Sequence, residues 1–527
     1  MSQPVNKNLD QAFGPIRSCF WPVYRHEVRK LLPMCFMIFL ICFSYNILRN
    51  MKDAIVVTTS GAEVIPFIKV WAMLPMAIVL TILFTKLSSR YSQQRVFNIM
   101  IGGFLCCFSL FAFVMYPFRD YLHFHGFADY LETILPVGFK GLISMFRYWT
   151  FTGFYVMSEL WATIVLNVLF WGFANEVTQI GEARRFYGVF GIGANVAAIL
   201  AGQSANLLSE IPATFGGIFA GRDEWESVQM VLVSVIVICG LGTMAIFRWM
   251  NLRVLNDPSF DNFHFNKRET KAKGKLSFRD SFSYLSNSKY LICIAAIVVS
   301  YNLVINLVEI VWKDQLYRLY SEPAEFNAYM NNITSATGIV STLLAVFMAK
   351  ILDKLGWTKT ALITPVIMLV TCVGFFSFLF FREHLAGVVV ALTGTTPLVI
   401  AVFFGGAQNC LSKGAKYSVF DATTNMAYIP LSHESKLKGK AAIDGVGSRF
   451  GKSGGSFIHQ GLLMVFSTLN ASAPYVAGCL LAVIGLWIGA VRSLGKQFNA
   501  ALGTTAAPSD QKAKHEESSE NKEVAVT

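Results

Sequence analysis

Long apolar runs recur along the whole chain, and they constrain its fold more than any other feature. Runs of about 20 residues, the length that an α-helix needs to cross a bilayer, occur six times before residue 250 and six times after residue 286. The expected spans are 33–58, 63–86, 96–117, 147–176, 184–208, 229–249, 287–312, 327–352, 357–381, 386–411, 440–467 and 473–495. We therefore expect an all-α polytopic membrane protein of about twelve transmembrane helices.

Composition excludes the other classes of chain. Hydrophobic residues make up 54% of the chain and charged residues 14%, whereas a soluble domain carries roughly 25% charged residues. A disordered chain, a disulfide-rich secreted module and a soluble enzyme are all excluded by these values. The runs predict five parts: an N-terminal segment 1–32, part of which has the composition of an amphipathic surface helix, a six-helix bundle 33–249, a linker 250–286, a second bundle 287–495 and a disordered tail 496–527.

The net charge of +12 reports topology. Lys and Arg gather in the N-terminal segment, in the linker and in the tail, which all lie on one side of a twelve-span arrangement. Positive loops stay in the cytoplasm, so both termini are expected there. Because the charge is spread over loops and not concentrated on one folded face, we expect no nucleic-acid partner.

The two sets of six runs contain an internal repeat. Ser44-Tyr45-Asn46, Asn50 and Asp53 in the first run recur as Ser300-Tyr301-Asn302, Asn306 and Glu309, at an offset of 256 residues. Gly188-Val189 recurs as Gly445-Val446 at an offset of 257, which places Asn195 opposite Lys452. Parallel six-span repeats are typical of the major facilitator architecture, in which substrate binds between the halves near the middle of the membrane.

Several charged residues fall inside the expected spans, where each costs about 2.5–3.5 kcal/mol and therefore faces a cavity or a partner. They are Arg49, Lys52, Asp53, Glu159, Glu309, Lys440, Asp444, Arg449 and Lys452, with Lys69 as a weaker case.

These charges predict an anion site between the halves. Lys52 and Lys452 could hold one anion from both sides, and positions 445, 452 and 455 share a Gly-rich helix face that would let a bulky ligand approach the backbone. We interpret Glu159 and Glu309 as acceptors without an adjacent Lys at helical spacing. Both carboxylates could pair with cations across the cavity or bind a proton.

Two other basic groups have alternative interpretations. Arg184 and Arg185 precede the fifth run, and Lys436, Lys438 and Lys440 precede the eleventh. They either set topology or attract a polyanion to the cytoplasmic mouth.

A phosphate loop is rejected. The segment 447–453 ends in Gly-Lys-Ser, but the position five before Gly451 is Val446, so the required spacing fails and no strand precedes it. We expect no hydrolysis, no metal and no cofactor, and the chain is not expected to be an enzyme.

Several motifs make the chain resemble the ATP/ADP translocase family of plastids and obligate intracellular bacteria. They are Arg49-Asn50-Met51-Lys52-Asp53-Ala54, Ser158-Glu159-Leu160-Trp161, Phe170-Trp171-Gly172-Phe173-Ala174-Asn175, Tyr187 to Asn195, Tyr301 to Trp312, Lys416 to Asp421, Met426 to Leu431 and Lys438 to Asp444.

The resemblance implies exchange of ATP for ADP, with or without phosphate, and no hydrolysis. It implies that two charged pairs fall on Lys52, Glu159, Glu309 and Lys452, and that Asn195 helps to discriminate the nucleotide. We expect Arg49, Lys440, Arg184 and Arg185 to contact substrate as well, and Asp53 and Asp444 to act in gating or coupling. Whether Lys440 or Lys452 is the main phosphate ligand of the second half stays open.

The resulting hypothesis is a monomeric antiporter of the bacterial inner membrane that imports host ATP. Unneutralised Lys residues facing each other would make the empty carrier reluctant to reorient. Proton-coupled import of nucleoside triphosphates and a non-transporting nucleotide sensor are the alternatives.

Overall fold

The computed structural model describes residues 22–25, 27–178, 180–214, 217, 221–254, 288–431, 439, 443 and 447–523. Every regular element in those ranges is a helix, which confirms the expected all-α fold. Residues 1–21, most of the linker and most of 432–446 lie outside the description, and with them most of the expected surface helix.

The first half contains six spans, several of them built from consecutive helical pieces. They are α3 (Val28–Ser60), then α4 (Val64–Phe67), η1 (Ile68–Ala72) and α5 (Met73–Arg90), then α6 (Gln93–Leu110) and η2 (Phe111–Met115), then α10 (Trp149–Trp161), η4 (Ala162–Phe170) and α11 (Trp171–Val177), then α12 (Ile180–Ser209), and α14 (Glu224–Trp249) with η5 (Met250–Val254). The short helices α7 (Arg119–Leu122), α8 (His125–Ile134), η3 (Val137–Phe139), α9 (Lys140–Arg147) and α13 (Ile211–Thr214) connect them.

The second half begins with α16 (Lys289–Leu319). The long α17 (Pro323–Phe380) breaks at Gly356, whose φ of 71° is left-handed and suits glycine, so this element supplies two spans. The remaining elements are α18 (Arg382–Thr393), α19 (Pro397–Ala415), η7 (Lys416–Phe420), α20 (Asp421–Ala427), α22 (Ser448–Phe466) and α23 (Leu469–Glu523).

The described residues contain most of the roughly twelve expected spans. Within the described ranges ten helices are long and apolar enough to cross a membrane, or eleven if Arg382–Thr393 and Pro397–Ala427, bent by 84°, form one span. The expected run 440–467 is described only at 443 and from 447 onward, and that described part does not qualify by itself. Its described part is α22, whose polar residues and glycines lower its apolar character.

Two helix ends extend beyond the expected boundaries. α16 continues to Leu319, seven residues past the expected end at 312, and residues 313–316 of this extension are buried although two of them are charged. α23 continues as a helix to Glu523, where we expected a disordered tail from 496. The Ala, Lys, Glu and Gln residues of that segment are good helix formers.

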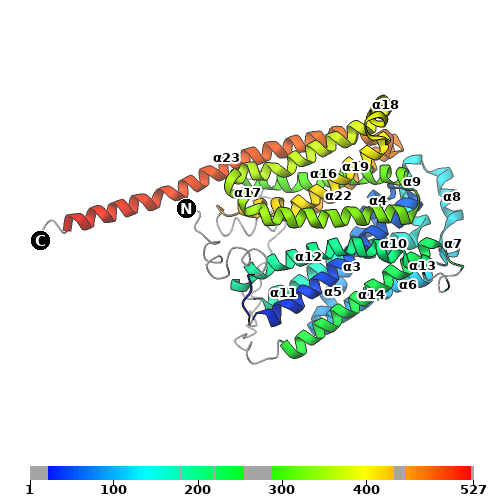
Figure 1. The fold of residues 1–527 in the computed structure, drawn as a ribbon, viewed down its shortest axis with the longest axis horizontal. Helices are drawn as coiled ribbons and strands as arrows, with labels where there is room; N and C mark the ends of the chain where they lie inside the picture. Colours follow the sequence, from blue (N-terminus) through cyan, green and yellow to red (C-terminus); the bar gives the residue numbers. More distant parts are fainter. Residues whose placement is uncertain are drawn as a thin grey trace.

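The helices form two bundles that lie side by side (Figure 1). In the first, α3 packs against α10, α12 and α14, and in the second α16 packs against α19, α22 and α23. The bundles meet along α12 and α17, along α3 with α16 and α17, and where α22 crosses α4 and η3. α3 and α16, the two helices that contain the repeated motif, therefore both lie at the interface of the bundles.

The repeated motif has the same local geometry in both copies. The side-chain amides of Asn46 and Asn302 each donate to the backbone carbonyl four residues earlier, at 2.8 Å. An amide satisfied within its own helix can be buried in a membrane span without a partner from another helix. The pattern that revealed the repeat is thus also a structural feature of each copy.

Candidate functional site

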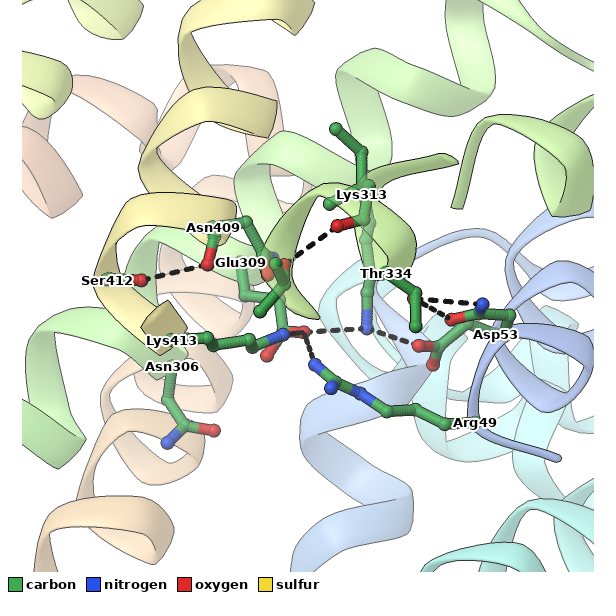
Figure 2. Close-up of polar contacts among 12 residues, drawn as sticks. Arg49, Asp53, Asn306, Glu309, Lys313, Thr334, Asn409, Ser412 and Lys413 are labelled. Atoms are coloured by element: carbon green, nitrogen blue, oxygen red, sulfur yellow. Dashed lines mark hydrogen bonds and ion pairs between the residues drawn. The ribbon is translucent and has the colours of Figure 1, made fainter. Parts of the chain in front are cut away.

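A continuous chain of ion pairs joins the two bundles. Lys52 Nζ lies 2.8 Å from Asp53 Oδ1 and 3.0 Å from Glu159 Oε1. Lys313 Nζ lies 2.8 Å from Asp53 Oδ2 and 3.4 Å from Glu309 Oε1. Since Asp53 is on α3 and Lys313 on α16, this pair bridges the halves (Figure 2).

Two further cations contact Glu309, at one end of this chain of ion pairs. Lys413 Nζ lies 3.2 Å and Arg49 Nη2 lies 3.7 Å from Glu309 Oε1. We call the complete set the charge cluster: Arg49, Lys52, Asp53, Glu159, Glu309, Lys313 and Lys413. It has four cations and three carboxylates, so one positive charge is in excess, and Lys69 adds a second nearby through its bond to Asn306 at 2.8 Å.

The centre of the charge cluster is closed to solvent. Lys52 and Asp53 are each 1% exposed, and Lys313 is 2% exposed. Lys52 Nζ also lies 3.8 Å from the ring centroid of Tyr155, whose π-face attracts a cation. A buried charge is tolerated when a partner of opposite sign compensates it, which explains why cations and carboxylates alternate here.

A cavity of about 550 Å³ lies between the halves beside the charge cluster. Its wall is formed by α3, α12, α17 and α19, with Leu166 and Trp171 from η4 and α11. Arg49 and Lys413 belong both to this wall and to the cluster. Pockets for small organic ligands have volumes of roughly 300–1,000 Å³, so a nucleotide-sized anion fits the available space.

Aromatic and amide side chains complete the wall of the cavity. Trp171 and Tyr187 meet edge to face with centroids 5.0 Å apart, and Asn195 lies on the same side of the cavity, on α12. Tyr45 and Tyr417 also line the wall. Such rings offer stacking surfaces for a planar base, while the two cations face a charged group.

Uncharged hydrogen bonds join the two halves at one end of the cavity. Asn50 Nδ2 donates to Asn331 Oδ1 at 2.8 Å, and Asn331 Nδ2 donates to Asn206 Oδ1 at 2.8 Å. Gln203 and Asn206 of α12 also reach Ser335 and Asn332 of α17, at 3.1 and 2.9 Å. We call this set the amide seam: Asn50, Gln203, Asn206, Asn331, Asn332, Thr334 and Ser335.

Glycine allows the backbones to approach closely along the amide seam. A Cβ on Gly202 would lie 2.2 Å from the carbonyl oxygen of Asn331, and one on Gly338 would lie 2.8 Å from that of Asn195. The seam lies toward the C-terminal part of α12 and the N-terminal part of α17, whereas the cavity continues toward the opposite ends of both helices. The halves are thus joined at one end of the interface and separated at the other.

Five of the predicted site residues come together in the charge cluster, and a sixth lines the cavity. Arg49, Lys52, Asp53, Glu159 and Glu309 form the cluster, and Asn195 lies on the cavity wall.

Arg185 lies elsewhere. Its guanidinium donates to Glu27 at 2.8 Å and to the carbonyl of Pro22 at 3.2 Å. It thereby ties the start of α12 to the segment before α3. Lys440 and Asp444 lie outside the described residues, and so do the side chains of Arg184 and Lys452.

The structure describes part of the Gly-rich face of α22. A Cβ on Gly451 would lie 2.7 Å from the Cβ of Asn302, and one on Gly455 would lie 3.0 Å from that of Asn306. Gly451 and Gly455 therefore let α22 pack closely on α16. Of the predicted face, residue 445 and the side chain of Lys452 lie outside the described residues, so only Gly455 is placed, and it packs against a helix.

Two cations of the cluster were missed in the sequence. Lys313 follows Glu309 by four residues, the spacing of neighbours on a helix surface, and it pairs with Glu309. The expected span ended at 312, which left it out. Lys413 lies near the C-terminal end of α19, past the expected span end at 411, and only the fold brings it to Glu309.

The structure also corrects the expected charge balance. Lys52 contacts Asp53 and Glu159, so it is not left unneutralised in the empty protein.

Among the described residues no group of three or more His, Cys, Asp and Glu side chains could hold a metal ion.

Comparison with known proteins gives the fold and the family. The chain has a TM-score of 0.52 to a D-xylose-proton symporter, at 12% identity over 87% of this chain and 97% of that one. It has a TM-score of 0.52 to a bacterial homologue of ferroportin in an inward-facing state, at 11% identity over 90% and 99%. Both likenesses show the major facilitator fold.

Several proteins have a much higher sequence identity to this chain than these solved structures do. The chain is 46% identical over 504 residues to ADP,ATP carrier protein 1 of Chlamydia muridarum, covering 94% of each protein. It is 41% identical over 474 residues to the chloroplastic ADP,ATP carrier protein 1 of Arabidopsis thaliana, covering 90% of this chain and 74% of that one. Residues 6–498 match the family described as TLC ATP/ADP transporter. The chain therefore belongs to the TLC ATP/ADP transporter family, a family of transporters and not of enzymes.

Proposed function

We propose that this protein exchanges ATP for ADP across a membrane by alternating access and without hydrolysis. The observation that carries the proposal is a cavity of about 550 Å³ between the halves, bordered by the partly buried Arg49 and Lys413 of a cluster in which cations outnumber carboxylates. Relatives from Chlamydia and Arabidopsis are named ADP,ATP carriers. A ligand with several negative charges offsets the excess, and its base can stack on the aromatic wall.

The mechanism uses contacts that join the halves. With the amide seam closed, substrate enters the cavity from the opposite end of the interface and reaches Arg49 and Lys413. Reorientation then requires the seam to open and the cavity mouth to close. The Asp53–Lys313 pair at 2.8 Å is a further contact that joins the halves.

Strict exchange follows from the ion pairs of the empty protein. Arg49 and Asp53 on α3 are held by Glu309 and Lys313 on α16. Separating such buried or partly buried pairs costs free energy, up to several kcal/mol for the fully buried one, unless another ion replaces the partner. A bound nucleotide supplies that replacement, and the empty protein has none.

Counter-exchange in proteoliposomes tests the proposal. We expect labelled ATP to leave preloaded vesicles when ADP is outside, and to stay inside when the buffer contains no nucleotide. Equal efflux into both buffers would exclude strict exchange. Flux driven by a pH gradient would favour proton-coupled import, and nucleotide binding without flux would favour a sensor.

The proposal includes the location and assembly of the protein. It is a monomer of the bacterial inner membrane with both termini in the cytoplasm, where the positively charged segments remain. Epitope tags at each end, probed in intact and opened spheroplasts, test the orientation: a tag accessible in intact spheroplasts would contradict it. Cross-linking that traps dimers in the membrane would contradict the monomer.

A further inference from the structure

One carboxylate oxygen collects three cations. Glu309 Oε1 lies 3.2 Å from Lys413, 3.4 Å from Lys313 and 3.7 Å from Arg49. These cations come from α19, α16 and α3, and they converge on the carboxylate in Figure 2. Phosphoryl oxygens and carboxylate oxygens are held by the same Lys and Arg groups. The arrangement is therefore one that a phosphoryl group would also satisfy.

Two of the three cations are shared with the cavity. Arg49 and Lys413 line its wall, from the first and second half respectively, whereas Glu309 and Lys313 do not belong to the wall. An anion in the cavity can therefore meet Arg49 and Lys413 directly. It can replace the carboxylate on these two cations without entering the closed centre of the charge cluster.

Asn409 adds an independent observation. It lies four residues before Lys413 on α19, lines the cavity and is 2% exposed. Its Nδ2 has no hydrogen-bond partner among the described residues. A buried amide without a partner costs about 1–3 kcal/mol. A donor kept in this state beside a lysine is placed to bind an acceptor that arrives with the ligand.

We propose that Arg49, Lys413 and Asn409 form a clamp for a phosphoryl group, and that Glu309 occupies the clamp when the carrier is empty. This inference rests on the proposed function and deepens it, because the phosphoryl group is the terminal one of the transported nucleotide. Binding exchanges one acceptor for another: Glu309 leaves Arg49 and Lys413 and keeps Lys313, and the phosphoryl oxygens take both cations and the amide of Asn409.

The exchange of acceptors makes Glu309 a lock. In the empty carrier, its contact with Arg49 joins α16 to α3. With nucleotide bound, the phosphoryl group itself joins α3 to α19 through the clamp. The halves are therefore connected in both states. The contact between Glu309 and Arg49 holds the empty carrier in one conformation, whereas the contact through the phosphoryl group can be kept while the halves reorient.

Ligand binding to purified protein tests the clamp. Thermal stabilisation is measured with ATP, with pyrophosphate and with adenosine, because a ligand stabilises the state that binds it. We expect Lys413→Gln to raise the Kd for ATP and pyrophosphate by about tenfold or more, as for the loss of a charge-assisted bond, and to leave adenosine unaffected. Lys416→Gln, one turn along the chain and outside the cavity wall, is the matched control and should change neither.

Asn409→Leu separates a ligand contact from a structural role. Because its Nδ2 has no partner to lose, we expect the variant without nucleotide to melt at or above the wild-type temperature, while the Kd for ATP rises about fivefold. A lower melting temperature with unchanged ATP affinity would overturn the clamp, and so would equal effects on adenosine and ATP. An inorganic phosphate Kd below that for ATP would show that the clamp serves free phosphate and not a nucleotide.

Efflux measurements test the lock. Glu309→Gln removes the charge that occupies the clamp, so we expect the ratio of efflux into nucleotide-free buffer to ADP-driven efflux to rise about tenfold or more. An unchanged ratio would overturn the lock. If wild-type protein shows no ADP-driven efflux, the proposed function fails; if it does and the variants behave like wild type, only the present inference fails. Should Glu309→Gln not insert, the binding tests on Lys413 and Asn409 decide.

Discussion

The two halves are joined by two regions with opposite chemistry. The charge cluster joins them through ion pairs such as Lys313–Asp53 at 2.8 Å, and the amide seam joins them through neutral hydrogen bonds such as Asn50–Asn331 at 2.8 Å. Charges interact over long distances in a low dielectric and respond to any ion that enters. Neutral amides act only at contact, and each contributes about 1 kcal/mol.

This difference assigns a task to each region. A polyanion in the cavity alters the balance of the charge cluster, so the cluster can register whether substrate is present. The amide seam gains nothing from a distant charge and is determined by packing, as the contact of Gly202 with Asn331 shows. The seam therefore sets which end of the interface is closed.

The largest effect is expected from Lys52→Met. The variant leaves Asp53 and Glu159 without the cation they share, and breaking a buried pair costs about 3–5 kcal/mol. We expect ADP-driven ATP exchange in proteoliposomes to fall by two orders of magnitude or more. Lys86→Gln, an exposed lysine at the end of α5, is the control and should keep wild-type exchange. Retained exchange in Lys52→Met would remove the charge cluster from the mechanism.

A bulky residue at Gly202 should disrupt the amide seam and leave the charge cluster intact. Leu cannot fit where a Cβ already lies 2.2 Å from the carbonyl oxygen of Asn331, so Gly202→Leu prevents the seam from closing. We expect exchange to fall at least tenfold while ATP still binds, measured by thermal stabilisation. Gly103→Leu is the matched control, because a Cβ there meets nothing within 4 Å. Normal exchange in Gly202→Leu would contradict the role of the seam.

Single changes within the amide seam should have smaller effects. Asn206→Ala removes its bonds to Asn331 and Asn332, worth about 1 kcal/mol each. We expect a severalfold change in exchange rate that does not depend on salt, since no charge is lost. The matching change in the cluster, Arg49→Gln, should alter the Kd for ATP in a salt-dependent way. Equal salt dependence in the two variants would contradict the assignment of neutral contacts to the amide seam and electrostatic contacts to the charge cluster.

A titrating group outside both regions should change stability and leave exchange intact. His123, between α7 and α8, is held by Thr150 at 2.8 Å, and its burial lowers the pKa from 6.5 to about 4. Between pH 6.5 and 4 the unfolded chain binds a proton that the folded chain does not, so stability falls as the pH is lowered through that window. We expect the melting temperature to drop from pH 7.5 to 5, and less so in His123→Gln. The same pH response in the variant would exclude His123 as its source.

Sequence patterns were sufficient where chemistry and periodicity act within one helix. The apolar runs predicted the spans, since a bilayer imposes a length and a hydrophobicity on each. The repeat brought Asp53 and Glu309 into consideration, and the cost of a charge in a membrane singled out Arg49, Lys52 and Glu159. All five lie in the charge cluster.

The pattern was insufficient where a residue lies near a span end or acts through another helix. Lys313 fell just past the expected end of its span, although its spacing to Glu309 was visible. Lys413 carried no signal of its own, because its partner is 104 positions away. The glycines of α22 looked like a ligand surface because sequence cannot tell whether a bare backbone faces a ligand or another helix.

The sequence by itself determined that this chain is a membrane-spanning bundle with an internal repeat and a few buried charges, because bilayer length and desolvation cost act on each residue separately. Only the tertiary structure decided how those charges pair, where the cavity lies and which contacts join the halves. Pairing depends on distances of about 3 Å between side chains from different helices, and such distances are fixed by how the helices pack and not by the order of residues along them.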